Sequence, residues 1–316
     1  MIRLAKQVLF FLLPLILFWI LAEIYLRNIA TTYDKKLEGL MEKADSVKVL
    51  VLGNSHACFG VAPSRFDYQT YNMAQLNQSL YFDKRIALKY LDTLRSLKFV
   101  LISIDYHSLY FSSQSIRDVW SYYTYGIEYK SQGSLITKYC RLKGYTPRVA
   151  FTFLRNHLSR NSDFNWPADL DSGVEYFSKK DNGWVIYEGT NWDVMNTEGY
   201  FSRALAFNRT VSTSIERNEV ISDLEEFIRI LKSKGVRPIF FTLPVYTDFR
   251  FYLDPQIHLM NINELNRLSQ LYDVPYFNLF DIDIKKNNFY NCDHLNREGA
   301  LVVSDLLNKK LMTLTY

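Results

Sequence analysis

Apolar residues form one long block near the start of the chain and only short runs afterwards. The block covers residues 8–26 and is interrupted by Pro14 and Glu23. Its length is about what a helix needs to cross the hydrocarbon core of a bilayer. A cleaved signal peptide has a shorter apolar centre and a small-residue cleavage site, which this segment lacks. We therefore predict a retained membrane anchor over residues 1–30, followed by a juxtamembrane linker over residues 31–46.

From residue 47 onward, short apolar runs alternate with segments of helical periodicity. The runs predict strands at 47–52, 68–73, 99–104, 238–243 and 276–279, and the periodic segments predict helices at 83–97, 215–234, 262–272 and 297–312. Such alternation is typical of a parallel sheet with helices on both faces. We expect an α/β domain over residues 47–316, a flavodoxin-like three-layer sandwich with a mainly parallel sheet.

A long segment between the two halves of this pattern, at about residues 112–214, shows little periodicity. It is rich in Tyr, Trp, Phe and Asn. A segment this long inside a compact domain is more often a lid or a substrate-binding wall than a plain loop. Its aromatic side chains are suited to stacking on sugars, and the packing of a small subdomain explains them equally well.

Charge and cysteine content narrow the classes of partner. The formal net charge is +4, and residues 1–36 alone carry five basic and two acidic side chains, so the domain itself is close to neutral. A nucleic-acid-binding protein needs a concentrated basic surface, and we exclude that class. Cys58, Cys140 and Cys292 are too scattered for a disulfide framework or a paired zinc site. We expect no metal and no cofactor.

The first candidate for chemistry is Ser55, in the run Gly53-Asn54-Ser55-His56 directly after the first predicted strand. Open α/β sheets bind ligands at the carboxyl ends of their strands, and Ser55 has that position. A helix that begins here offers free N–H groups to an oxyanion beside Ser55. The alternative is an ordinary strand-to-helix turn in which Asn54 and Ser55 act as caps. Asn54 and His56 are expected to line the oxyanion site or the pocket.

A second segment, residues 291–296 (NCDHLN), falls just before the last predicted helix and so at the same edge of the sheet. His294 is placed to take the proton of Ser55, because a serine hydroxyl needs a base before it can act as a nucleophile. Asp293 is the nearest carboxylate to this histidine. Asn291 could orient the ring only as a neutral hydrogen-bond acceptor. These residues do not decide which group completes a catalytic triad with Ser55 and His294.

Two blocks, residues 51–56 (VLGNSH) and 293–300 (DHLNREGA), resemble the nucleophile and histidine blocks of the SGNH, or GDSL-like, hydrolase superfamily. The resemblance is closer to its membrane-anchored branch, which is related to polysaccharide O-acetyltransferases and teichoic-acid D-alanylation proteins. It covers about residues 47–311 apart from the central insertion. It implies an SGNH-like fold and a serine that forms an acyl-enzyme.

The chain also departs from the pattern of this family. The family usually places its catalytic Asp three residues before the histidine, where this chain has Asn291. Either Asp293 takes over, or Ser55 and His294 work as a pair with an Asn or backbone acceptor, or activity is reduced. The family's two further oxyanion residues are not obvious here. Asn77 is the best candidate, although a turn-forming Asn is at least as good an explanation.

The resemblance implies an enzyme that acts on polysaccharide or other acyl-ester substrates. Ser55 would take an acyl group, commonly acetyl, and pass it to a polysaccharide hydroxyl or to water. The domain would lie on the extracytoplasmic side of a membrane spanned by residues 8–26, and a multispanning membrane protein would supply the acyl group. The alternative is a non-catalytic carbohydrate-binding or scaffold protein on the same fold.

Overall fold

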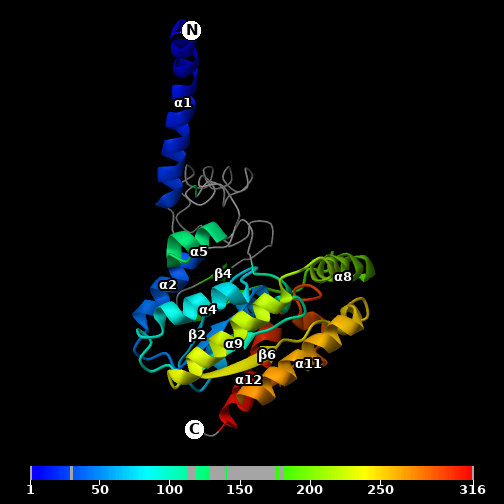
Figure 1. The fold of residues 1–316 in the computed structure, drawn as a ribbon. Coiled ribbons are helices and arrows are strands. Elements are labelled where there is room, and N and C mark those ends of the chain that lie inside the picture. The colour runs from blue at the N-terminus through cyan, green and yellow to red at the C-terminus, as the bar shows by residue number, and fades with distance from the viewer. Residues whose placement is uncertain are drawn as a thin grey trace.

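The computed structural model describes residues 2–28, 31–112, 118–128, 140, 176–177 and 181–314. Helix α1 (Ile2–Arg27) projects away from the rest of the molecule (Figure 1). Its apolar side chains are exposed, with Phe10 at 83% and Phe18 at 73%. By length and composition it is able to cross a membrane. This agrees with the predicted N-terminal anchor and leaves the side of the membrane open.

Helix α2 (Thr32–Glu42) occupies most of the segment that the sequence analysis treats as a linker. Thr31 and Asp34 form a capping box, in which each side chain bonds the backbone N–H of the other residue. The helix buries Tyr33 and Leu40 completely in the main core. The linker expectation for residues 31–46 is therefore corrected, because this short helix gains its stability from packing rather than from a long periodic pattern.

The main sheet has five strands in the order β2-β1-β3-β6-β7. Every neighbouring pair is parallel. Counted along the chain within this sheet, the order is the 2-1-3-4-5 of flavodoxin-like folds. The predicted fold class is confirmed. The strands are β1 (Val49–Leu52), β2 (Thr70–Asn72), β3 (Phe99–Ser103), β6 (Arg237–Thr242) and β7 (Tyr276–Asn278).

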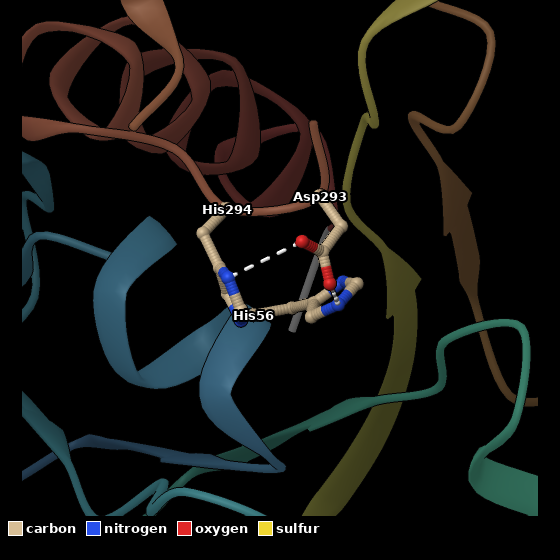
Figure 2. Close-up of side chains that lie close together, drawn as sticks. All are labelled: His56, Asp293 and His294. Carbon is tan, nitrogen blue, oxygen red and sulfur yellow. Dashed lines mark ion pairs between the residues drawn. The ribbon is translucent and has the colours of Figure 1, made fainter. Parts of the chain in front are cut away.

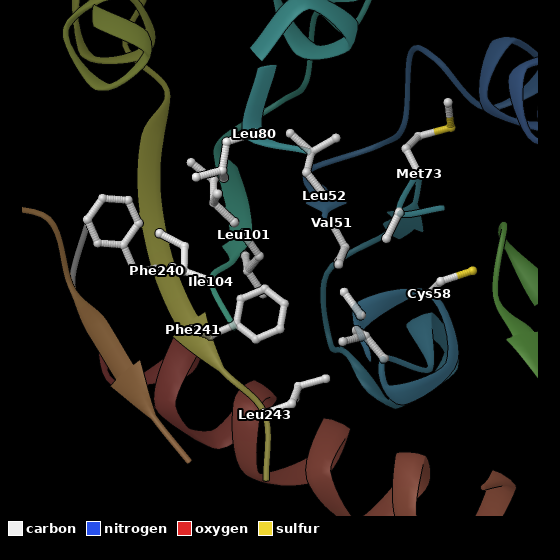
Figure 3. Close-up of a cluster of buried hydrophobic side chains, with 14 of the residues drawn as sticks. Val51, Leu52, Cys58, Met73, Leu80, Leu101, Ile104, Phe240, Phe241 and Leu243 are labelled. Atoms are coloured by element: carbon white, nitrogen blue, oxygen red, sulfur yellow. The ribbon is translucent and has the colours of Figure 1, made fainter. Parts of the chain in front are cut away.

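Helices cover both faces of this sheet (Figure 1). One face carries α4 and α9, which pack together, and the other carries α3 and α12. Figure 3 shows the core between them, with Leu52, Leu101 and Phe240 among the buried side chains of the sheet. The helices are α3 (Ser55–Gly60), α4 (Leu80–Tyr90), α9 (Arg217–Ser233), α10 (Thr247–Arg250), α11 (Pro255–Tyr272) and α12 (Arg297–Met312).

Two helix boundaries differ from the expected ones for local reasons. α11 begins at Pro255, well before the predicted residue 262, because Asp254 caps it and Pro255 suits the first helical position. α4 begins at Leu80 and ends at Tyr90, earlier than the predicted 83–97. The remaining residues to 97 form turns that lead into β3.

The described part of the central insertion forms regular elements rather than a plain loop. They are α5 (Asp118–Tyr125), the antiparallel pair β4 (Tyr176–Phe177) and β5 (Val185–Ile186), and α8 (Thr197–Ser212). Short 3-10 turns lie at Pro63–Arg65, Ser108–Tyr110 and Lys286–Asn288. Residues 113–117, 129–139, 141–175 and 178–180 of the insertion lie outside the described residues.

The turn after β1 requires glycine at position 53. Gly53 has φ 139°, and a Cβ added there would lie 2.5 Å from the Ser103 Cβ. Gly53→Ala should lower the free energy of unfolding by about 1–3 kcal/mol through overpacking, in addition to backbone strain. Denaturant unfolding of the full chain in detergent measures this. The control is Gly189→Ala, which also has positive φ but has open space around it, and an equal loss in both variants would contradict the packing argument.

Candidate active site

The order of the sheet reverses between β1 and β3, and this is where the candidate residues gather. Ser55 follows β1, and Asp105 follows β3. Parallel α/β sheets bind ligands in the crevice at the carboxyl ends of the strands on either side of such a switch point. The loop before α12 reaches the same place because α12 packs against α3. Three segments that are far apart in sequence thus meet here.

Backbone contacts hold the turn that carries Ser55. The N–H of Gly53 donates to the buried Asp83 Oδ1 at 3.1 Å, and the N–H of Gln75 donates to the Gly53 carbonyl at 3.1 Å. Asn54 is the N-cap of α3, and its Oδ1 accepts from the N–H of His56 at 2.9 Å. Asn54 therefore has the capping role that the sequence left open, and Ser55 is the first helical residue.

Hydrogen bonds also hold the loop that carries His294, residues 291–296 before α12, which we call the histidine loop. Asn296 caps α12, where its Oδ1 accepts from the N–H of Gly299 at 3.1 Å. Its Nδ2 donates to the carbonyls of Asn287 and Gly189 at 2.7 and 2.9 Å. These bonds explain the Asn at position 296, and the glycine at 299 is required because a Cβ there would lie 2.1 Å from the Asn288 carbonyl oxygen.

Ser55 and His294 meet as the sequence predicts: the distance between His294 Nε2 and Ser55 Oγ is 2.8 Å. Asn291 Oδ1 accepts the backbone N–H groups of Asp293 and His294 at 3.2 and 2.8 Å, so this atom is the amide oxygen. The same oxygen lies 3.1 Å from His294 Nδ1. Because an oxygen only accepts, Nδ1 carries the proton. Nε2 is then free to accept the hydroxyl proton of Ser55.

Asp293 lies beside this histidine with a completely buried side chain (Figure 2). Its Oδ1 is 3.4 Å from His294 Nδ1, farther than the oxygen of Asn291. Its Oδ2 accepts from Arg203 Nε at 2.8 Å and pairs with Arg203 Nη2 at 2.7 Å. Asn291 therefore makes the hydrogen bond that fixes the tautomer, and Asp293 supplies the nearest negative charge.

His56 does not line a pocket as expected, because its side chain is only 3% exposed. Its ring lies between two carboxylates, with Nδ1 3.2 Å from Asp105 Oδ1 and Nε2 3.4 Å from Asp293 Oδ2. Figure 2 shows His56 and His294 on two sides of the Asp293 carboxylate. His56 is predicted to line the pocket because it follows Ser55 in the sequence. The first turn of α3 instead directs the two side chains to different surroundings.

The two histidines have opposite pKa shifts. Burial lowers the pKa of His56, but the charges of Asp105 and Asp293 outweigh burial and raise it to about 10. Burial lowers the pKa of His294 to about 3, with Asp293 opposing this shift and the His56 charge adding to it. Burial also opposes ionisation of Asp293, yet the charges of Arg203 and the histidines hold its pKa well below the usual value. At neutral pH His56 is a cation and His294 is neutral.

His56, Asp293 and His294 are also the group that offers possible metal-ligand atoms within 4.8 Å of one another. Arg203 already donates a hydrogen bond to Oδ2 of Asp293, and His294 is hydrogen-bonded at both ring nitrogens. An additional divalent cation would sit beside two positive side chains. The donor set therefore fits an ion-pair network better than a metal site.

Asn77 has a different environment from the one expected for an oxyanion donor. It is exposed and has φ 56°, the left-handed conformation of a turn-forming Asn. Among the described residues, no hydrogen bond joins its side chain to Ser55 or His294. The turn explanation accounts for this residue.

Two further residues at the site, Arg203 and Phe207 on α8, are not among the candidates that the sequence predicts. Phe207 packs against His107, with ring centroids 4.6 Å apart, and against His56 at 6.3 Å. The signal for α8 is present in the chain: Asn196 is a helix cap, and the buried residues recur at helical spacing as Tyr200, Ala204, Phe207 and Val211. A cavity of about 360 Å³ lies beside α8, with Ser202, Arg203, Asn291 and Asp293 in its lining.

The solved structures that resemble this chain include two of low sequence identity. No family model and no curated protein matches the chain. One similar structure is a Bacteroides fragilis protein described as an acylhydrolase, at 12% identity and TM-score 0.41, covering 88% of this chain and 96% of that one. Another is a carbohydrate esterase, at 10% identity and TM-score 0.33, covering 86% and 70%. Such values say nothing about the activity of this chain.

The chain has an SGNH-like fold, as its own topology indicates. The sheet order is 2-1-3-4-5, the serine follows the first strand, and the histidine precedes the last helix. These are the positions that the two sequence blocks predict. Membership of the membrane-anchored branch stays a prediction.

The opposite charge states of the two histidines can be observed directly. In full-length protein with labelled histidine, NMR at pH 7 should show His56 as a doubly protonated cation and His294 as the neutral Nδ1–H tautomer. On raising the pH, His56 should deprotonate near pH 10, because Asp105 and Asp293 stabilise its charge. Asp105→Asn should bring that pKa down. A neutral His56 at pH 7 would contradict this assignment.

Proposed function

We propose that this chain is a membrane-anchored serine acyl-enzyme that transfers or removes O-acyl groups, with Ser55 as nucleophile and His294 as general base. The observation that carries the proposal is the 2.8 Å contact between Ser55 Oγ and the unprotonated Nε2 of His294. Nucleophile and base within hydrogen-bond reach, with a third group holding the base, is the arrangement that nucleophilic catalysis by serine requires. Asn291 is that third group here.

In the first half of the reaction, Ser55 Oγ attacks the carbonyl carbon of an acyl ester, and His294 Nε2 takes the hydroxyl proton. The ring then carries two protons, and the Asp293 carboxylate, 3.4 Å from Nδ1, stabilises the positive charge. His294 returns the proton to the leaving alcohol. The backbone N–H of Ser55 at the start of α3 is the proposed donor to the oxyanion.

In the second half, an acceptor hydroxyl attacks the acyl carbon while His294 Nε2 takes its proton. The bond between that carbon and Ser55 Oγ then breaks, and His294 returns the proton to Ser55 Oγ. A sugar hydroxyl as acceptor gives a transferase, and water gives an esterase. We favour an extracytoplasmic polysaccharide as the substrate because the sequence resembles envelope acyl-transfer proteins and α1 is suited to a membrane anchor. In the transferase form, a multispanning membrane protein would deliver the acyl group to the same domain.

Labelling with a fluorophosphonate probe tests the nucleophile. We expect the full chain in detergent to form one adduct at Ser55, because the probe reacts with a serine whose proton a base can remove. Ser55→Ala should abolish the adduct, and His294→Ala should slow its formation by about 10²–10⁴-fold, the usual contribution of a general base. Intact-mass measurement against time gives both values.

Matched controls separate chemistry from unfolding. Ser212→Ala on the exposed end of α8 and His258→Ala on α11 should label like the wild type, and all variants should keep the wild-type circular dichroism. A folded wild-type protein that forms no adduct would contradict the proposal. If such a protein still bound acetylated glycan, the non-catalytic binding alternative would replace it.

The pH dependence of labelling follows from the lowered pKa of His294. A base works in its neutral form, and burial holds the pKa of His294 at about 3, below the 6.5 of a free histidine. Labelling should therefore continue undiminished as the pH falls from 8 through 6.5, and should decline only at more acid pH. A half-maximal rate near pH 6.5 would show that His294 titrates like an exposed histidine.

A further inference from the structure

Four charged side chains form an alternating row behind the catalytic histidine. In order they are Asp105, His56, Asp293 and Arg203, with contacts of 3.2, 3.4 and 2.7 Å between successive members. Asp105 follows β3, His56 lies on α3, Asp293 precedes α12 and Arg203 lies on α8. Each member comes from a different element, so the row exists only when all four elements are packed together.

Burial explains why the charges alternate. The side chains of Asp105, His56 and Asp293 are exposed by 2%, 3% and 0%. A buried charge without a partner is very costly, whereas paired buried charges can be retained. The raised pKa of His56 and the lowered pKa values of both carboxyl groups mean that all members are ionised at neutral pH. The row carries two negative and two positive charges and is electrically balanced.

The contacts also fix the orientation of the Asp293 carboxylate. Both cations approach the same oxygen: Arg203 and His56 contact Oδ2, while Oδ1 faces His294 Nδ1. A carboxylate held at one oxygen from two sides cannot rotate without breaking both ion pairs. Oδ1 is thereby kept at the ring on which positive charge develops during the reaction.

We propose that His56 and Arg203 are positioning residues for the acyl-transfer reaction, acting on the orientation of His294 through the Asp293 carboxylate that they hold. This inference rests on the proposed function of Ser55 and His294 and adds two residues from outside the serine–histidine pair. His56 is buried between Asp105 and Asp293, and Arg203 pairs with Asp293 Oδ2. Asn291 sets the tautomer of His294, and the row of charges fixes the position of the Asp293 carboxylate, which stabilises the positive charge on the His294 ring.

The row also links the active site to the central insertion. Arg203 is 41% exposed and lies on α8, at the end of the insertion, whereas its partner Asp293 lies in the histidine loop. Phe207, one turn further along α8, packs against His107 and lies tilted against the His56 ring, with centroids 6.3 Å apart. The docking of α8 therefore completes the set of contacts around Asp293.

A double-mutant cycle tests the proposal. The variants are His56→Asn, Arg203→Gln and Asp293→Asn, singly and with each of the first two combined with the third, in the full chain. The readout is kcat and KM for a simple activated acetyl ester. Each single change should lower kcat by about 100-fold, a usual loss when a catalytic group is misplaced, with KM nearly unchanged. Each double variant should be no slower than Asp293→Asn alone, because the effect passes through Asp293.

The controls are His258→Asn and Arg209→Gln, which replace a half-buried histidine on α11 and an exposed arginine on α8, outside the site, and should match the wild type in kcat. Losses that multiply in the double variants would overturn the proposal, since they would show an effect independent of Asp293. So would an unchanged kcat in folded His56→Asn and Arg203→Gln. If His56→Asn fails to fold, the cycle between Arg203 and Asp293 decides, because Arg203 is partly exposed and its loss leaves the core intact.

The result also distinguishes this inference from the proposed function. A wild type that hydrolyses the ester through Ser55, together with variants that behave additively, overturns the positioning role alone. A wild type without any turnover or acylation overturns the proposed function, and the positioning role with it.

Discussion

The buried carboxylate of Asp293 is the constraint around which the site is arranged. It is completely removed from solvent, and an ionised group in such a place requires positive partners. Arg203 and His56 meet this need at Oδ2, which leaves Oδ1 facing the ring of His294. His56 in turn needs Asp105 on its other side. The buried charge of Asp293 therefore accounts for the contacts of Arg203 and His56 and for the carboxylate oxygen that faces His294.

In a serine–histidine–aspartate triad, one carboxylate fixes the tautomer of the histidine and stabilises its positive charge. Here these two tasks are divided between Asn291 and Asp293. Asn291 accepts the Nδ1 proton of His294 at 3.1 Å and so selects the tautomer in which Nε2 can act as a base. Asp293 lies slightly farther away and contributes charge. A neutral amide in the place of a carboxylate also occurs in Cys-His-Asn proteases, where an asparagine orients the histidine. The departure of Asn291 from the SGNH pattern is thus compatible with a working base.

Much of the fold could be predicted from local patterns. The strands of the main sheet are short, β1 and β3 consist of apolar, partly β-branched runs, and each strand lies within or close to its expected range. The pair of Ser55 and His294 could be predicted because parallel strands bring their carboxyl ends to one edge of the sheet. Helix α2 was missed because its short amphipathic pattern gives little signal apart from the capping box of Thr31 and Asp34.

The charge row could not be predicted in this way. Arg203 and Asp293 are 90 residues apart, and nothing in the local sequence of either residue indicates the partner. The sequence places His56 directly after Ser55 and so predicts that it lines the pocket, whereas the packing of α3 on the loops after β3 and before α12 buries it. The group that orients His294 could not be predicted either, because Asn291 and Asp293 are both close to His294 in sequence.

The central claim is that Ser55 becomes acylated while His294 accepts its proton. The most direct test is rapid mixing of the full-length protein with an activated acetyl ester, followed by acid quenching and measurement of the intact mass. We expect a transient mass increase of one acetyl group, located at Ser55 by peptide mapping and absent in Ser55→Ala. Turnover of the ester without acetyl on Ser55, or acetyl on a different residue, would contradict it.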